Sequence, residues 1–144
     1  KTQVPTRWID QGAVQALPIV EVPNRYLAGI TEVALKNYYA DKTNWQKMLK
    51  NDVAWVDLFQ EREKIASVLP EEVRPYFHPE AQELYELHYP VLNYPSKVTS
   101  LILEKTKQYS GKLIGVKGQY LLFEDQTVFN VRTYEGYEVR ITIA

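Results

Sequence analysis

The residues with the clearest chemical potential lie together on one predicted helix. Arg25, Gly29, Glu32 and Lys36 are spaced so that they share one stripe of a helix. Two cations beside a carboxylate could face phosphate and hold a hard divalent ion such as Mg²⁺ or Mn²⁺ through Glu32. The simpler interpretation is a surface ion pair between Glu32 and Lys36, worth roughly 0.2–0.5 kcal/mol, and the pattern alone favours it.

Two residues outside this helix could complete such a site. Arg7 lies near the start of another predicted helix, where a guanidinium can bind phosphate through two hydrogen bonds. Its alternative role is to lie along the ring of Trp8. Asn44 could steady a carboxylate or a water near a metal ion. It could equally be an ordinary polar residue after Thr43, because "TNWQ" reads as a capping box with Thr43 as N-cap.

The N-terminal part of the chain, residues 1–69, is expected to position these side chains on helices. Apolar residues recur there at helical spacing, and proline, glycine and capping signals mark the ends. The expected elements are a short helix ended by Gly12, a strand over 13–22, a helix over 25–38, a helix that starts at Thr43 and an amphipathic helix over 54–69.

The rest of the chain has a different pattern. Residues 70–95 hold five of the eight prolines and are predicted to be a linker with one strand over 83–89. Residues 96–144 form short β-rich runs separated by turn signals. This predicts an α+β chain whose second half is a small antiparallel barrel or sandwich, to which the 83–89 strand could belong. The expected strands span 97–104, 112–118, 120–123, 127–132 and 137–143.

Composition excludes several classes of protein. The net charge of −1 gives no global attraction to nucleic acid, so any polyanion site must be a local patch. The chain has no cysteine, which excludes a disulfide framework and a cysteine-ligated zinc within it. No apolar run is long enough for a membrane helix, and the start has no signal-peptide core. We expect a cytoplasmic protein and, since there is no initiator Met, a piece of a longer chain.

A basic stretch in the second half is a second candidate for polyanion binding. It carries one acid, Glu104, among five lysines, and Lys97, Lys107, Lys112 and Lys117 are the candidate contacts, together with Arg25 and Lys36 of the helix. The alternative is that these lysines only protect exposed strand edges from aggregation. Several of the eleven tyrosines could stack on bases or form the rim of a core (85, 89, 94, 120, 134 and 137).

Three stretches of the sequence resemble one protein family. They are "TQVPTRWIDQGA", "ADKTNW" and "GVKGQYLLFEDQTVFNVRTYEGYEV", and they resemble the bacterial family called domain of unknown function 2797. The resemblance names no activity. It implies that an upstream cysteine-rich, zinc-ribbon-like segment and a strand pair similar to the start of a GIY-YIG endonuclease domain precede this chain.

The first half also resembles the back half of a GIY-YIG domain. The order of an arginine on the first helix, a strand, a glutamate on the next helix and then an asparagine is matched by Arg7, Glu32 and Asn44. By this resemblance Arg7 stabilises phosphate, Glu32 binds the divalent ion and Asn44 supports the site.

The strands that carry the tyrosines of that class are absent from this chain, so we expect it to be inactive alone. Within the longer protein it could form a divalent-metal-dependent endonuclease. The function favoured is therefore nucleic-acid binding, with a site that is active or degenerate. The alternative is a non-catalytic module that binds a protein partner.

Overall fold

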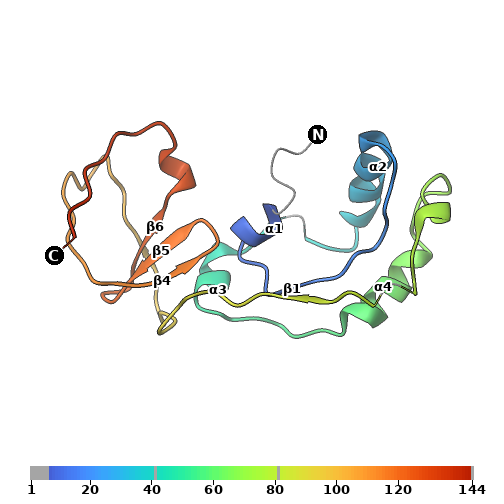
Figure 1. Ribbon diagram of the computed structural model, residues 1–144, viewed down its shortest axis with the longest axis horizontal. Coiled ribbons are helices and arrows are strands. Elements are labelled where there is room, and N and C mark those ends of the chain that lie inside the picture. The colour runs from blue at the N-terminus through green and yellow to red at the C-terminus, as the bar shows by residue number, and fades with distance from the viewer. Residues whose placement is uncertain (1–6, 41, 81, 144) are drawn as a thin grey trace.

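The computed structural model describes residues 7–40, 42–80 and 82–143, and it confirms the α+β class. The chain has two ends with different structure (Figure 1). The helices α2 (Arg25–Leu35) and α4 (Leu58–Ala66) lie at one end, and a four-stranded sheet lies at the other. The short helices α1 (Arg7–Asp10) and α3 (Trp45–Leu49) lie between them.

Each longer helix begins at a side-chain cap that the sequence supplies locally. Asn24 accepts a hydrogen bond from the backbone N–H of Leu27 at the start of α2. Asp57 accepts hydrogen bonds from two backbone N–H groups at the start of α4, where its negative charge also suits the helix dipole. Both helices are shorter than expected at their C-terminal ends, and α4 also begins at Leu58 and not at residue 54, because Asp57 is its N-cap.

The expected cap of α3 is wrong by one residue. Asn44, not Thr43, is the N-cap, and its Oδ1 accepts the N–H of Lys47 at 3.1 Å. Asparagine is at least as good a cap as threonine, so the shift costs nothing. The consequence is that the side-chain oxygen of Asn44 is already occupied by the helix.

The main sheet has the order β3-β6-β5-β4 and is open. Its strands β4 (Leu113–Lys117), β5 (Tyr120–Phe123) and β6 (Thr127–Asn130) form an antiparallel meander. The edge strand β3 (Thr99–Ser100) is parallel to β6, so the sheet is mixed. A separate two-stranded sheet joins β1 (Gln15–Ala16) to β2 (Tyr85–Glu86). Short 3₁₀ helices span Arg74–Tyr76 and Arg132–Tyr134.

Four expected strands are much shorter than predicted or are not formed. The runs over 13–22, 83–89 and 97–104 each contain a strand of only two residues, and the strand within 83–89 pairs with β1 and not with the main sheet. The run over 137–143 has the alternating pattern of a strand but pairs with no other strand in the described chain. A strand needs a partner at the correct distance, which the pattern of one segment cannot supply.

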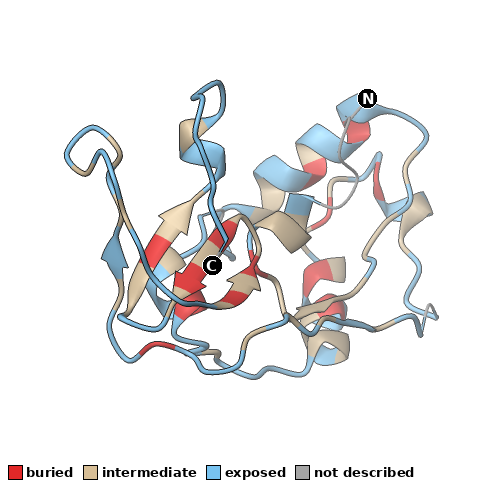
Figure 2. Ribbon diagram, turned by 60° about the vertical axis from the view of Figure 1, so that its left-hand side comes forward, coloured by how far each residue is buried: buried red, intermediate tan, exposed pale blue. Residues whose placement is uncertain are grey.

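The buried residues form two clusters. One joins Leu27 of α2 to Ile65 of α4, together with Leu69 and Val73. The other joins Met48 and Leu49 of α3 to residues of β5 and β6 (Tyr120, Leu122, Val128). Figure 2 shows the buried residues gathered on the sheet and on the inner faces of the helices. Helix α3 therefore belongs to the core of the sheet, although the first strand of that sheet, β3, begins only at Thr99.

Candidate functional site

The turn between β4 and β5 docks against the end of α1. Gly118 in this turn has a φ of +57°, and Gln119 donates its backbone N–H to the carbonyl of Asp10 at 3.0 Å. The hydroxyl of Tyr89 lies within hydrogen-bond distance of the carbonyl oxygens of Ile9 and Ala13, at 3.1 and 2.8 Å. These polar contacts join the first residues of the described chain to the sheet.

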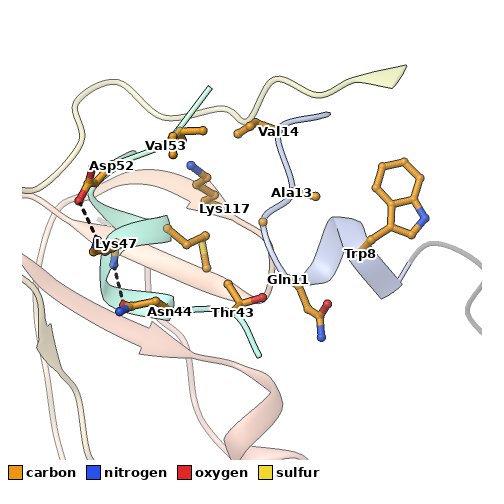
Figure 3. A pocket seen from close by; sticks show the side chains of 13 residues that line it. Trp8, Gln11, Ala13, Val14, Thr43, Asn44, Lys47, Asp52, Val53 and Lys117 are labelled. Atoms are coloured by element: carbon orange, nitrogen blue, oxygen red, sulfur yellow. Dashed lines mark hydrogen bonds and ion pairs between the residues drawn. The ribbon is translucent and has the colours of Figure 1, made fainter. Parts of the chain in front are cut away.

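A cavity of about 360 Å³ lies beside this junction (Figure 3). One side is formed by α1 and the residues after it, and the opposite side by α3 and the segment that follows it. Trp8 lies at one edge, half-buried, and Lys47 pairs with Asp52 at 4.0 Å at the other. The remaining lining residues are Gln11, Gly12, Ala13, Val14, Thr43, Asn44, Met48, Val53, Ala54 and Lys117.

Lys117 is the least expected member of this lining, because the residue has no exposed surface. Its Nζ donates a hydrogen bond to Oδ1 of Asn51 at 2.8 Å. The ammonium also lies over the rings of Tyr94 and Tyr89, at 4.8 and 5.6 Å from their centroids. Within the described ranges no carboxylate pairs with it, so burial lowers the pKa of Lys117 below its usual range. Lys117 therefore cannot serve as one of the exposed lysines of a surface patch.

The burial of Lys117 follows from the glycine two residues before it. Val91 pairs with Gly115 in an antiparallel bridge beside β4, so close that a Cβ on Gly115 would lie 2.9 Å from the Cα of Val91. The segment that contains Val91 can approach only because Gly115 has no side chain. The same segment brings Tyr89 and Tyr94 over the face of β4 that Lys117 shares with Gly115.

Replacing this lysine should change how stability depends on pH. Between the lowered pKa of folded Lys117 and its ordinary pKa, the unfolded chain binds more protons, so this group makes stability rise with pH. We expect Lys117→Met to be at least as stable as the parent at neutral pH. This advantage over the parent should shrink as the pH rises towards the ordinary lysine pKa of about 10. Urea unfolding of both proteins across this range measures the difference.

The control for this experiment is Lys112→Met. Lys112 is exposed and pairs with Glu124 at 2.9 Å, so its loss should cost less than about 1 kcal/mol. A stability difference between parent and Lys117→Met that does not change with pH would contradict the lowered pKa.

A second cavity, of about 450 Å³, adjoins the first. The two share Gln11, Thr43 and Met48 in their linings. Three cations from distant parts of the chain line the second cavity: Arg7 of α1, Lys42 before α3 and Arg132 after β6. None of these three forms an ion pair with another residue that the structure describes, and all three are exposed.

The remaining walls of this second cavity are aromatic and polar. Trp45 and Tyr120 stack with ring planes 8° apart and centroids 6.0 Å apart. Asp10 supplies the one carboxylate among the described lining residues, and Gln119 completes the wall. The second cavity thus has an excess of positive charge beside a flat apolar surface.

The site residues predicted from the sequence do not all meet here. Arg7 and Asn44 line the two adjoining cavities, but Glu32 lines neither. Glu32 is largely exposed on α2, with its carboxylate 3.5 Å from Nζ of Lys36, as the ion-pair interpretation expects. Arg25, at the first turn of the same helix, is also exposed and outside both cavities.

The candidate lysines of the second half are dispersed. Lys97 and Lys107 are exposed in the loops that flank β3, and Lys112 is held by Glu124. Sequence reasoning missed Lys42 and Arg132 as members of one cluster. Neither has a neighbour in the sequence that marks it as functional, and only the fold brings them to Arg7.

Two kinds of feature are absent from the described residues. No cluster of three or more histidine, aspartate or glutamate side chains has the arrangement of a metal site in the part of the chain that the structure describes. Among the same residues, no helix has the length and apolar character to cross a membrane.

The fold and the cavities define an α+β protein with a basic, aromatic-lined hollow where its two ends meet. The chain belongs to the family described as "Protein of unknown function (DUF2797)", whose model matches residues 1–139. No curated protein matches the chain, and no solved structure does.

Proposed function

We propose that this protein binds nucleic acid in the hollow formed by the two adjoining cavities. The observation that carries the proposal is the convergence of Arg7, Lys42 and Arg132 in one cavity with a single described carboxylate, Asp10, and with no ion pair at any of the three among the described residues. Arginine binds phosphate with two parallel hydrogen bonds, and uncompensated cations attract a polyanion even when the net charge of the protein is near zero.

The aromatic lining supports the same ligand. Bases stack on flat side chains, and Trp8 is half-exposed at the rim of the first cavity. Trp45 and Tyr120 supply a second apolar surface beside the cations. Cavities of about 360 and 450 Å³ lie within the ordinary range for small-ligand sites, and each suits about one nucleotide rather than a duplex.

Hydrolysis by a GIY-YIG-like site is a narrower form of this proposal. It would require Glu32 to hold Mg²⁺ or Mn²⁺ near the phosphate that Arg7 contacts. The pairing of Glu32 with Lys36, and its position outside both cavities, favour binding without cleavage by this chain alone. The capping bond of Asn44 argues in the same direction.

The test is a titration of labelled single-stranded and double-stranded DNA and RNA at low and moderate salt, read by fluorescence anisotropy. We expect Arg7→Ala and Arg132→Ala each to weaken binding by about tenfold, the loss of one charge-assisted hydrogen bond. Each should also reduce the dependence of log affinity on log salt by about one unit, because fewer counterions are released.

Three controls separate this proposal from its rivals. Lys64→Ala removes an exposed cation of α4 that pairs with Glu61, far from the hollow in sequence, and should leave affinity unchanged. If Lys97→Ala and Lys107→Ala weaken binding more than the arginine variants do, the contact surface is the basic stretch instead. If no oligonucleotide binds at either salt concentration, the proposal fails and the alternative of a protein partner is favoured.

Cleavage is checked in the same samples on a gel with Mn²⁺ present. We expect intact oligonucleotide from the parent chain and no effect of Glu32→Ala on affinity. Products that disappear in Glu32→Ala would instead make Glu32 a metal ligand.

A further inference from the structure

The C-terminal segment over residues 137–143 has the sequence of a β-strand with one buried face. Tyr137, Val139, Ile141 and Ile143 alternate with polar residues, and that period of two is typical of a strand whose apolar side is covered. In the described chain nothing covers it. The apolar residues are 54%, 52%, 79% and 92% exposed, in that order.

The start of this segment is fixed, and the rest is an unpaired extended chain. The hydroxyl of Tyr137 donates to Glu104 at 2.8 Å, and its ring meets that of Tyr134 edge to face. Among the described residues, no backbone hydrogen bond is made by residues 138–143. Figure 1 shows this stretch at the outer edge of the end that holds the sheet, ending at the C-terminus. Such a strand is a template for pairing with another chain.

The charges of the segment are complementary to those of a second copy of the same segment. Glu138 and Arg140 lie on its polar face, and neither forms a salt bridge with a residue in the described ranges. An antiparallel pair of two identical segments centred on Val139 places Glu138 of each copy opposite Arg140 of the other. The same register puts Tyr137 opposite Ile141 and collects the apolar side chains on one face.

Other pairings of the same two segments are disfavoured. A centre one residue later would place Arg140 opposite Arg140, and a parallel pair in register would oppose like charges at both polar positions. Only the Val139-centred antiparallel register places Glu138 of each copy opposite Arg140 of the other, and it has the two-fold symmetry that closes a dimer.

We infer that residues 137–143 pair with the same segment of a second copy of this chain, as an antiparallel strand pair centred on Val139. One strand pair buries less surface than a standard stable interface does. The dimer should therefore be weak, and the fraction of chains in it should change over the protein concentrations used in sedimentation. This inference does not rest on the proposed nucleic-acid site, because none of its residues lines either cavity.

A charge exchange tests the register. Sedimentation velocity over a range of concentrations should show a monomer–dimer equilibrium for the parent. Glu138→Arg turns both cross-strand ion pairs into repulsions and should weaken the dimer by about tenfold or more. The double variant Glu138→Arg with Arg140→Glu restores opposite charges in this register and should restore dimerisation. A parent that remains monomeric, or a double variant no better than the single one, overturns the inference.

A cross-linking experiment tests the symmetry axis directly. Since the chain has no cysteine, Val139→Cys introduces a single thiol that meets its own copy across the two-fold axis, within the reach of a disulfide. Leu92→Cys is the matched control, because Leu92 is 78% exposed and lies outside the segment. Mild oxidation should yield far more covalent dimer from Val139→Cys. Equal yields from the two variants would contradict the proposed pairing.

Discussion

Gly118→Ala is expected to lower the free energy of unfolding by roughly 2–4 kcal/mol, through strain in the turn and overlap with a neighbouring backbone. The φ of +57° at this residue is unfavourable for alanine, and an added Cβ would overlap the carbonyl oxygen of Asp10. That carbonyl also accepts the N–H of Gln119, so the substitution should displace the β4–β5 turn from α1. Urea unfolding measures the loss.

The same substitution should weaken the nucleic-acid binding that we propose. Arg7 lies on α1, and Arg132 follows β6, on the sheet side of the contact, so displacement of the turn separates the two guanidinium groups. The expected loss of affinity is at least that of removing one arginine, about tenfold. Anisotropy with the same oligonucleotides provides the readout.

Gly136→Ala is the matched control. Gly136 has a φ of +90°, but no atom lies within 4 Å of the position that a Cβ would take. This variant therefore carries backbone strain without the overlap. It should lower the free energy of unfolding by less than Gly118→Ala does, and it should keep the parent's affinity for the oligonucleotides. Equal losses in the two variants would mean that the contact with Asp10 contributes nothing.

Leu49→Ala is expected to destabilise the chain by about 2–5 kcal/mol, the ordinary cost of removing a large side chain from a core. Leu49 has no exposed surface, and it packs with Met48 of the same helix against Tyr120, Leu122 and Val128. The helix α3 has only five residues and cannot be stable alone, so its position depends on this packing. Chemical denaturation followed by circular dichroism measures the change.

Leu92→Ala provides the comparison for this core variant. Leu92 is 78% exposed, and its truncation should change stability by less than about 0.5 kcal/mol. If Leu49→Ala is as mild as Leu92→Ala, α3 is not part of the core that it shares with β5 and β6.

The elements that the sequence predicted well are those with local causes. The meander of β4, β5 and β6 follows from alternating runs joined by short turns, which need no distant partner. The helices α2 and α4 follow from an apolar stripe and a capping residue within a few positions. The Glu32–Lys36 pair follows from helical spacing alone.

The segments that were predicted poorly depend on contacts across the chain. The runs over 13–22 and 97–104 have strand-like composition, but each forms a strand of only two residues, and the first run adds one isolated bridge from Val20 to Phe77. Lys117 is the last of the five lysines of the basic stretch, yet it is buried because Gly115 lets the Val91 segment pair closely beside β4. The charges near Lys117 in the sequence do not indicate that its side chain is buried.

The sequence by itself determined the α+β class and the two sets of elements. The tertiary structure decided which cations meet. Arg7, Lys42 and Arg132 converge because the Gly118 turn docks on α1 and α3 packs beneath the sheet. Hydrophobic periodicity and capping act over a few residues, whereas this convergence depends on close packing between segments more than a hundred residues apart, which no local pattern encodes.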